Sequence, residues 1–318
     1  MPYVLITGGD GFLGKAVSTR AALIQGCKVR VSTRRSSVAS ENRVESVHVA
    51  DLSLAVDWLP ALQKIDAVVH LAARVHVMHD TSTNPLKEFR VVNVDGTLNL
   101  ARQAAAEGVK RFVFVSSVKV NGEATQPGQM FSETNTPAPQ DPYGISKMEA
   151  ELELLQIAAE TGMEVVIIRP PLVYGPGVKA NFAALMRVVQ RGWPLPLGAM
   201  HNQRSLVALD NLVDFIVTCL THPNAANQTF MVSDGQDLST SELVRGLAHA
   251  AGVSVRLLPV PVWLLQAGAV LLGKSDAVQR LCGNLQVDIS KARSLLGWVP
   301  PVSVNEGLYR AVNRLEKP

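Results

Sequence analysis

The chain has 318 residues, of which 47% are hydrophobic and 18% are charged, and its formal net charge is +3. These values are typical of a globular protein with a substantial core and exclude a disordered chain, and the small, scattered positive charge argues against nucleic acid as a partner. The three cysteines are far apart and form no paired motif, so we expect a reduced, cytoplasmic protein.

Short β-branched runs alternate with longer helical patterns through the first half of the chain. The predicted strands are residues 3–7, 28–33, 46–50, 66–72, 111–117 and 164–169. Between them lie helical patterns such as residues 12–26, which end at a glycine. Apolar strands joined by helices are typical of a parallel sheet that is covered on both faces. The sequence therefore predicts an α/β fold with a doubly wound parallel (Rossmann) sheet.

The pattern of predicted elements changes after the last of these strands. Residues 169–177 form a loop rich in proline and glycine, and few strands follow it. Helical patterns are then found at residues 180–190, 210–221 and 239–250. We expect a dinucleotide-binding domain over residues 1–170 and a smaller substrate-binding lobe over residues 171–318, with segments around 204–232 returning to the first domain.

The most apolar run of the chain is residues 262–273, with the sequence VWLLQAGAVLLG. It is too short to cross a bilayer, which takes about 20 residues. We interpret it as a buried helix, with contact to a membrane or a partner surface as the less favoured alternative. Because the first predicted strand begins at residue 3, we also expect no signal peptide. The sequence thus predicts no stable insertion into a membrane.

The stretch TGGDGFLG, residues 7–14, lies between the first predicted strand and the first predicted helix. Glycines at this spacing let the backbone turn tightly, approach a pyrophosphate and pack the helix against the strand. The helix N-terminus then offers free N–H groups and the positive end of its dipole. This context predicts a dinucleotide site. The cofactor contacts expected here are Gly8, Gly11, Phe12, Leu13 and Gly14.

The second predicted strand ends at Thr33, and Arg34 and Arg35 follow. A carboxylate at this place would bind the ribose 2′-hydroxyl of NAD, whereas arginines suit the 2′-phosphate of NADP. The sequence therefore favours NADP(H) and leaves NAD(H) open, and the alternative is that the arginines only face solvent. After the third strand, Asp51 and Leu52 are expected beside the adenine, although Asp51 fits a helix N-cap equally well.

Tyr143 and Lys147 are four residues apart at the start of a predicted helix, so they share one face of it. An ammonium close to a phenol favours the phenolate and lowers the phenol pKa from about 10, which makes it usable as an acid or base near neutral pH. Ser117 ends the strand 111–117, at the edge of the sheet where ligands bind in doubly wound folds. A serine there can hold the substrate oxygen, although the Tyr–Lys spacing alone also fits a structural accident.

Together these motifs resemble the extended short-chain dehydrogenases/reductases of the NAD-dependent epimerase/dehydratase family, which act on nucleotide sugars. The matching segments, in the order of the family, are TGGDGFLG (7–14), HLAA (70–73), NVDGT (93–97), FVSS (114–117), YGISK (143–147), RPPLVYGPG (169–177) and LLGWVP (295–300). The resemblance implies that the catalytic residues are Ser117, Tyr143 and Lys147, with the last two also contacting the cofactor. The further cofactor contacts that it implies are Leu71, Ala72, Ala73, Asn93 and Pro170, where Asn93 also helps to hold the active-site strand. It places Arg204 at the diphosphate of the substrate.

Three departures from the family pattern bear on the reaction. Val118 and Lys119 stand where the dehydratases carry an Asp-Glu pair, so we expect no dehydration. The arginines after the second strand differ from the acidic residue that is frequent in epimerases, which hold NAD tightly. Asn121 stands where a tyrosine commonly follows the catalytic serine, so we expect one wall of the sugar pocket to be altered.

From the resemblance and these departures we expect an NADPH-dependent reductase of a nucleotide-linked 4-keto(-6-deoxy) sugar. Its substrate would be a UDP- or dTDP-sugar that serves surface-polysaccharide synthesis, with hydride passing to C4 and Tyr143 as the proton donor. The first alternative is an NAD(P)-dependent UDP-hexose C4 epimerase, and a more remote one is a non-catalytic cofactor-sensing protein. The family requires no metal, and a homodimer is compatible with it.

Overall fold

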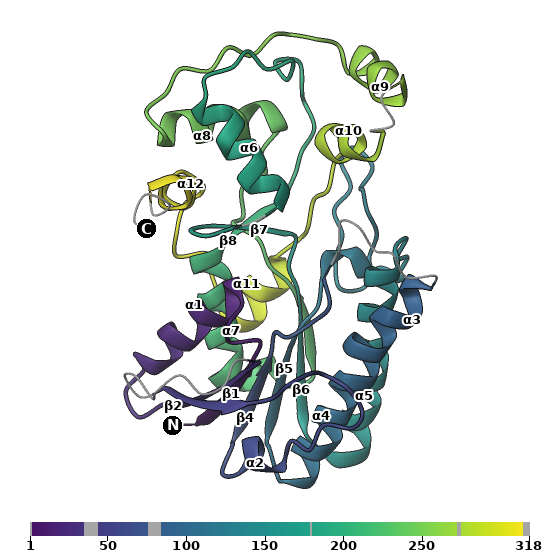
Figure 1. The fold of residues 1–318 in the computed structure, drawn as a ribbon, viewed down its shortest axis with the longest axis vertical. Helices are drawn as coiled ribbons and strands as arrows, with labels where there is room; N and C mark the ends of the chain where they lie inside the picture. Colours follow the sequence, from purple (N-terminus) through teal and green to yellow (C-terminus); the bar gives the residue numbers. More distant parts are fainter. Residues whose placement is uncertain (1, 35–43, 76–83, 179, 272–274, 314–318) are drawn as a thin grey trace.

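A seven-stranded parallel sheet forms the centre of the protein in the computed structural model, which describes residues 2–34, 44–75, 84–178, 180–271 and 275–313 (Figure 1). The strand order is β3-β2-β1-β4-β5-β6-β9. The strands are β1 (Tyr3–Thr7), β2 (Lys28–Thr33), β3 (Val44–His48), β4 (Ala67–His70), β5 (Arg111–Val115), β6 (Glu164–Arg169) and β9 (Gln228–Met231). The order reverses between β1 and β4, which makes a topological switch point. This arrangement confirms the predicted α/β fold with a doubly wound sheet.

Helices cover both faces of the sheet, which explains why its strands are apolar on both sides (Figure 1). Val4 and Ile6 belong to the core on one face, and Leu5 between them belongs to the core on the other face. The first core is completed by α1 (Phe12–Ala22), α7 (Leu209–Thr221) and α11 (Ser290–Leu296). The second is completed by α2 (Leu59–Leu62), α4 (Gly96–Ala106) and α5 (Pro142–Thr161).

A second layer of structure lies beyond the carboxyl edge of the sheet and has its own hydrophobic core. It is built from β7 (Leu172–Tyr174), α6 (Ala180–Gln190), β8 (Leu206–Ala208), α8 (Thr240–Ala250) and α12 (Val304–Asn313). β7 starts directly after the end of β6 and pairs with β8 in parallel, so this lobe begins where the strands of the main sheet end. The chain returns to the main sheet with β9, which pairs with β6.

The remaining elements are short. They are α3 (Pro85–Arg90), a π-helical turn η1 (Val91–Asp95), 3-10 turns η2 (Val118–Val120) and η3 (Pro223–Ala225), α9 (Val262–Leu271) and α10 (Ser275–Cys282). A π-helical turn inside a helical segment is rare and is frequently found at functional sites. Here η1 connects α3 to α4, next to the carboxyl edge of the sheet.

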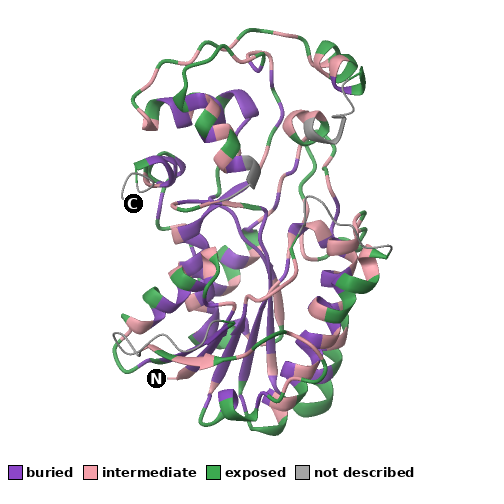
Figure 2. Cartoon of the chain, viewed as in Figure 1, coloured by how far each residue is buried: buried purple, intermediate pink, exposed green. Residues whose placement is uncertain are grey.

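The apolar run 262–273 forms the helix α9 up to Leu271, but the prediction that this helix is buried is wrong. Trp263 is 65% exposed and Leu271 is 87% exposed, and Ala269 is buried among the residues of α9 that the structure describes. Figure 2 shows the helix as mostly exposed or half-buried at the outer end of the lobe. Within the described part of the chain, no helix combines the length and the apolar character that a bilayer crossing requires.

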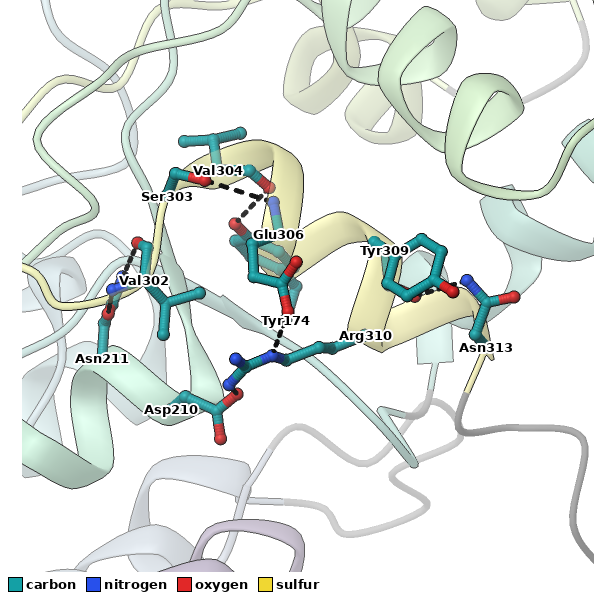
Figure 3. A network of polar contacts seen from close by, with 10 residues as sticks. All are labelled: Tyr174, Asp210, Asn211, Val302, Ser303, Val304, Glu306, Tyr309, Arg310 and Asn313. Atoms are coloured by element: carbon teal, nitrogen blue, oxygen red, sulfur yellow. Dashed lines mark hydrogen bonds and ion pairs between the residues drawn. The ribbon is translucent and has the colours of Figure 1, made fainter.

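Polar side chains fasten the C-terminal helix α12 to α7 (Figure 3). Asn211 is fully buried and binds both backbone groups of Val302, donating to its carbonyl at 2.8 Å and accepting from its N–H at 2.8 Å. Arg310 pairs with Asp210 at 2.7 Å and with Glu306 at 2.7 Å. The contacts of Asn211 and Asp210 hold α7, on the main sheet, to the segment of the second layer that contains α12.

We expect Asn211→Ala to lower the free energy of unfolding by about 2–4 kcal/mol, because it leaves the buried backbone groups of Val302 without their side-chain partner and removes one hydrogen bond to the carboxylate of Asp234. Urea denaturation followed by circular dichroism measures this change. Asn313→Ala is the matched control, because its side chain is exposed and donates to the carbonyls of Ala250 at the end of α8 and Tyr309 in α12. A loss below about 0.5 kcal/mol for both variants would contradict the assigned role of Asn211.

Candidate active site

The glycine loop after β1 is packed so closely that its glycines have no room for a side chain. Gly8 has a φ of +71°, and a Cβ on it would lie 2.9 Å from the backbone nitrogen of Ala72. A Cβ on Gly14, in the first turn of α1, would lie 2.1 Å from the carbonyl oxygen of Gly8. The hydroxyl of Thr7 accepts hydrogen bonds from Leu71 and Ala72, at 3.2 Å each. The loops after β1 and β4 are therefore fixed against each other.

This arrangement fits the pyrophosphate of a dinucleotide. The N-cap of α1 is Gly11, which has no side chain to bind the N–H groups of the first turn. Those N–H groups and the positive end of the helix dipole can bind an anion that approaches the side-chain-free loop. Phe12 and Leu13 follow at the start of α1, where their half-buried side chains pack on the core of the sheet. The glycine loop thus lies against Leu71 and Ala72, and the contact of these residues with a cofactor stays a prediction.

The end of β2 lies beside the glycine loop, because the N–H of Gly9 donates to the carbonyl of Ser32 at 3.3 Å. Thr33 is buried and Arg34 is exposed. Arg35, the second predicted phosphate-binding residue, lies outside the described residues. The described end of β2 is therefore polar and carries a cation, with no carboxylate between residues 32 and 34.

Asp51 and Leu52 follow β3 in an extended loop, and Asp51 is exposed. The next helix, α2, begins at Leu59, so the alternative that Asp51 caps a helix is wrong. Leu52 lies against the start of α4, because a Cβ on Gly96 would be 2.5 Å from its carbonyl oxygen. The contact of Asp51 with an adenine stays a prediction.

The helix that carries Tyr143 and Lys147 is started by its own sequence. Asp141 is the N-cap of α5, and its carboxylate accepts a hydrogen bond from the N–H of Gly144 at 2.6 Å. Pro142 follows at the first helical position, where its fixed φ suits a helix and its missing N–H costs nothing. Tyr143 and Lys147 therefore occupy the first two turns, one above the other.

Lys147 is directed into the end of β5. The residue is 2% exposed, and its Nζ donates to the carbonyl oxygen of Val115 at 3.0 Å. The same nitrogen lies 4.4 Å from the ring centre of Phe114 and 6.0 Å from that of Tyr143. Burial lowers the pKa of Lys147 to about 7, and the negative charge of Glu151 one turn later opposes this shift.

The pKa of Tyr143 differs from the sequence prediction, which expected the neighbouring lysine to lower it. Burial raises the pKa of Tyr143, and the negative charge of Asp141 raises it further. The ammonium of Lys147 binds the carbonyl of Val115 and lies 6.0 Å from the ring centre of Tyr143. The ring of Tyr143 is half-buried and meets Phe89 edge to face at 6.1 Å.

Ser117 lies where the predicted strand 111–117 leaves the sheet. β5 ends at Val115, and Ser117 is the half-buried N-cap of the turn η2, accepting from the N–H of Lys119 at 3.2 Å. The preceding Ser116 is 3% exposed, and its hydroxyl has no hydrogen-bond partner among the described residues. The carbonyl of Pro170, directly after β6, accepts from the N–H of Val118 at 3.0 Å. An unbonded buried hydroxyl at the carboxyl edge of the sheet marks a place where a ligand can supply the missing bond.

Asn93 connects three parts of this edge. It lies in the π-helical turn η1, and its side chain binds the backbone N–H and carbonyl of Arg74 at 2.8 and 3.0 Å. Its amide also donates to the hydroxyl of Ser146 in α5 at 3.0 Å. Asn93 is 1% exposed, so the amide fixes the loop after β4 relative to the helix that carries Tyr143.

Arg169 and Asn121 form a buried network beneath the edge of the sheet. Arg169 pairs with Glu151 of α5 at 3.0 Å and donates to the side-chain oxygen of Asn121 at 2.9 Å. Asn121 is 3% exposed and donates to the carbonyl of Ser132 at 2.9 Å. The side chain of Asn121 is thus bonded inside the protein, and the altered wall of the sugar pocket stays a prediction.

Arg204 lies in the second lobe, apart from the contacts described above. Its guanidinium donates to the carbonyls of Arg280 and Gly283 at 2.8 and 3.0 Å, at the end of α10. Burial lowers the pKa of Arg204, and the charge of Glu123 opposes this shift. Its contact with a substrate diphosphate stays a prediction.

The sequence reasoning missed two features of the site. One is the unbonded hydroxyl of Ser116, and the other is an ion pair between Lys119 and Asp141 next to Tyr143. The sequence contains a signal for the position of Asp141, because an aspartate directly before a proline is a typical helix start.

Comparison with known proteins gives the context of this site. The family model described as "NAD dependent epimerase/dehydratase family" matches residues 4–233. A UDP-glucose 4-epimerase of Vibrio cholerae is 50% identical over 305 residues, which cover 96% of this chain and 92% of the relative.

Solved structures agree with this result. The UDP-glucose 4-epimerase of Thermotoga maritima, determined with UDP-glucose, has a TM-score of 0.75 and 26% identity and covers 98% of both chains. The UDP-glucuronic acid 4-epimerase of Bacillus cereus, determined with NAD, has a TM-score of 0.78 over 99% of this chain and 96% of the other. At 21% identity, the second likeness concerns the fold alone.

The main hypothesis from the sequence, a 4-keto-sugar reductase, is wrong, because the 50% identical relative is a 4-epimerase. The hypothesis rested on the arginines after β2, which concern the choice of nucleotide. A reductase and an epimerase use the same proton-transfer residues, so these residues do not distinguish the two reactions. The remote alternative of a non-catalytic sensor is wrong for the same reason.

We expect Gly14→Ala to weaken binding of NAD(P) by at least about tenfold, because the new Cβ would displace the backbone of Gly8 from the glycine loop. Isothermal titration calorimetry with each dinucleotide measures the affinity. Gly268→Ala in α9 is the matched control, since a Cβ there meets nothing within 4 Å. Equal affinities for the two variants would show that the loop is not the dinucleotide site.

Proposed function

Because the chain belongs to the NAD-dependent epimerase/dehydratase family and is an NAD(P)-dependent enzyme of that family, we propose that it is a UDP-hexose 4-epimerase. The observation that carries the proposal is the close likeness to the Vibrio cholerae UDP-glucose 4-epimerase along almost the whole chain. The proposal is further supported by the positions of Ser117, Tyr143 and Lys147, which come from the elements that follow β5 at the carboxyl edge of the sheet.

In the proposed reaction, Tyr143 removes the proton from the C4 hydroxyl of the sugar and later returns it to the same oxygen. Ser117 donates a hydrogen bond to that oxygen, which bears negative charge when the C–O bond is polarised. When bound, the oxidised nicotinamide supplies a hydride acceptor for C4 and a positive charge that favours the phenolate. Because the proton and the hydride would both return to the sugar, the reaction would consume no cofactor.

Lys147 contributes to this reaction through its fixed position. Its bond to the carbonyl of Val115 holds the ammonium at the end of β5, on the face of α5 that also carries Tyr143. A cation there stabilises the phenolate over a short distance and can bind a ribose hydroxyl of the cofactor. Because burial already lowers the pKa of Lys147 to about 7, the ammonium depends on nearby negative charge and hydrogen-bond acceptors to remain protonated.

The nucleotide preference follows from the end of β2. Arg34 is exposed beside the glycine loop, and the described end of the strand lacks the carboxylate that selects NAD. We therefore favour NADP(H), with NAD(H) as the alternative. The second lobe, which contains Arg204, would bind the UDP part of the substrate over the carboxyl edge of the sheet.

We expect the purified protein to interconvert UDP-glucose and UDP-galactose with no net change in NAD(P)H absorbance. Tyr143→Phe should reduce the turnover number by about 10²-fold or more, because no other described group occupies the position of the phenol. Proton NMR of the anomeric signals follows the reaction, and Tyr309→Phe, on an exposed tyrosine of α12, is the control. Net oxidation of NADPH with a 4-keto sugar but no hexose interconversion would refute the epimerase.

We expect Arg34→Ala to weaken binding of NADP⁺ by about tenfold and to leave binding of NAD⁺ within about twofold, since the guanidinium meets only the 2′-phosphate. Fluorescence titration of each nucleotide against the wild type and the variant measures the two affinities. Arg20→Ala, an exposed arginine of α1, corrects for the loss of one positive charge. If both nucleotides lose the same factor, Arg34 does not read the 2′-phosphate.

A further inference from the structure

Lys119 lies between two carboxylates at the edge of the proposed active site. It belongs to the turn η2, two residues after Ser117, and its Nζ binds Glu123 at 2.9 Å and also forms an ion pair with Asp141. Its side chain is 30% exposed, which is comparable to the 28% and 26% of the two partners. Burial alone would lower the pKa of Lys119, but the hydrogen bonds to Asp141 and Glu123 raise it, so the ammonium is charged.

The two carboxylate oxygens of Asp141 accept hydrogen bonds from two different groups. Oδ1 caps α5 by accepting from the N–H of Gly144, and Oδ2 accepts from Lys119. The turn η2 and the first turn of α5 are in direct contact, because a Cβ on Gly144 would lie 2.9 Å from the carbonyl oxygen of Lys119. The capping carboxylate is therefore fixed two residues before Tyr143. Its second oxygen, Oδ2, is bound by the ammonium of Lys119.

A negative charge in that position works against a phenolate. Asp141 adds to the effect of burial in raising the pKa of Tyr143, and a base must lose its proton to act. The cap itself is needed to start α5 behind Pro142. The carboxylate that caps the helix therefore disfavours the phenolate form of Tyr143, the residue that the helix positions.

Charged and titratable groups face Tyr143 or its direct neighbours from several elements. His70 of β4 is held neutral, since burial lowers its pKa to about 3, and it binds Thr7 and Thr97. Arg74, in the loop after β4, stacks on Phe89, which contacts the phenol ring. These groups are Asp141 at the N-cap of α5, Lys147 in α5, Lys119 and Glu123 around η2, Arg74 and His70.

A direct contact with the substrate is the less suitable role for Lys119. Its ammonium already binds two carboxylates, and a substrate anion would have to displace one of them. A role in stability is also weak, because a partly exposed ion pair contributes about 0–1 kcal/mol. The feature specific to this pair is that its carboxylate caps α5 two residues before the proposed base.

We propose that Lys119 is a positioning residue that neutralises the capping carboxylate of Asp141 and so allows the phenolate of Tyr143 to form in the catalytic pH range. The inference rests on the proposed role of Tyr143 as the base of a 4-epimerase. Lys119 stands at the second of the two positions at which the dehydratases of the family carry an Asp-Glu pair.

The test compares the pH dependence of kcat/KM for UDP-galactose in the cofactor-loaded wild type, Lys119→Met, Asp141→Asn and the double variant. The activity falls on the acidic side as the phenolate is protonated, so this limb reports Tyr143. Lys119→Met should move it to higher pH by about 0.5–1 unit, an approximately 3- to 10-fold loss at acidic pH that vanishes on the alkaline plateau. Asp141→Asn keeps a capping oxygen, removes the charge and should move the limb to lower pH.

Two controls separate this effect from a structural one. Lys119→Arg should restore the wild-type pH profile, because it returns a cation to the same carboxylates. Lys110→Met makes the same change in net charge on an exposed lysine before β5, at the opposite edge of the sheet, and should leave the profile unchanged. A loss of activity in Lys119→Met that is equal at every pH would overturn the proposal.

A second measurement does not depend on turnover. The chain has four tyrosines, so NMR of tyrosine labelled with ¹³C at Cζ in the protein loaded with its oxidised cofactor gives separable signals, and Tyr143→Phe identifies the signal of Tyr143. The pKa of Tyr143 should rise in Lys119→Met and fall in Asp141→Asn. If the wild type does not interconvert hexoses, the proposed function fails and this titration still decides the charge pair. Identical titrations in all variants would overturn the pair whether or not the enzyme is an epimerase.

Discussion

The bond from the buried ammonium of Lys147 to the carbonyl of Val115 is the interaction on which the site depends. A buried lysine without an acceptor would lose its proton or leave the interior. The last carbonyl of β5 serves as this acceptor because parallel strands end with carbonyl groups that the sheet no longer uses. The edge of the sheet therefore fixes the register of α5 and, with it, the place of Tyr143. The same edge brings Ser117 from the end of β5 onto the next turn of chain.

Other contacts keep this edge rigid without taking part in the chemistry. Asn93 ties the loop after β4 to α5, and Arg169 ties β6 to the same helix through Glu151. The side chains of these residues are almost fully buried, and such pairs are costly to break because a lone charge or amide would remain behind. The helix of Tyr143 is thus held from both neighbouring strands. A base and a hydroxyl donor that share one oxygen need this accuracy, since a small displacement removes their combined effect.

The sequence predicted those parts of the fold that local sterics determine. The glycine loop could be recognised because Gly8 and Gly14 face backbone atoms that leave no room for a Cβ. The strands could be recognised because burial on both faces requires continuous apolar runs. The burial of α9 could not be predicted, since its apolar residues do not reveal that the lobe leaves Trp263 and Leu271 uncovered. The position of Asn121 was missed for a related reason, because its partner Arg169 is 48 residues away in the chain.

The direction of the pKa shift of Tyr143 shows that residue spacing predicts which side chains share a site more reliably than it predicts their pKa values. Helical spacing correctly places Lys147 and Tyr143 on one face, but the phenol also responds to its burial and to Asp141, which starts the helix. The reaction is even less visible in local sequence. A reductase and an epimerase move the same proton and the same hydride. They differ in whether the keto sugar rotates in the site before the hydride returns. That difference depends on the space around the sugar and on how long the cofactor stays bound, which are properties of the lobe and the loops together.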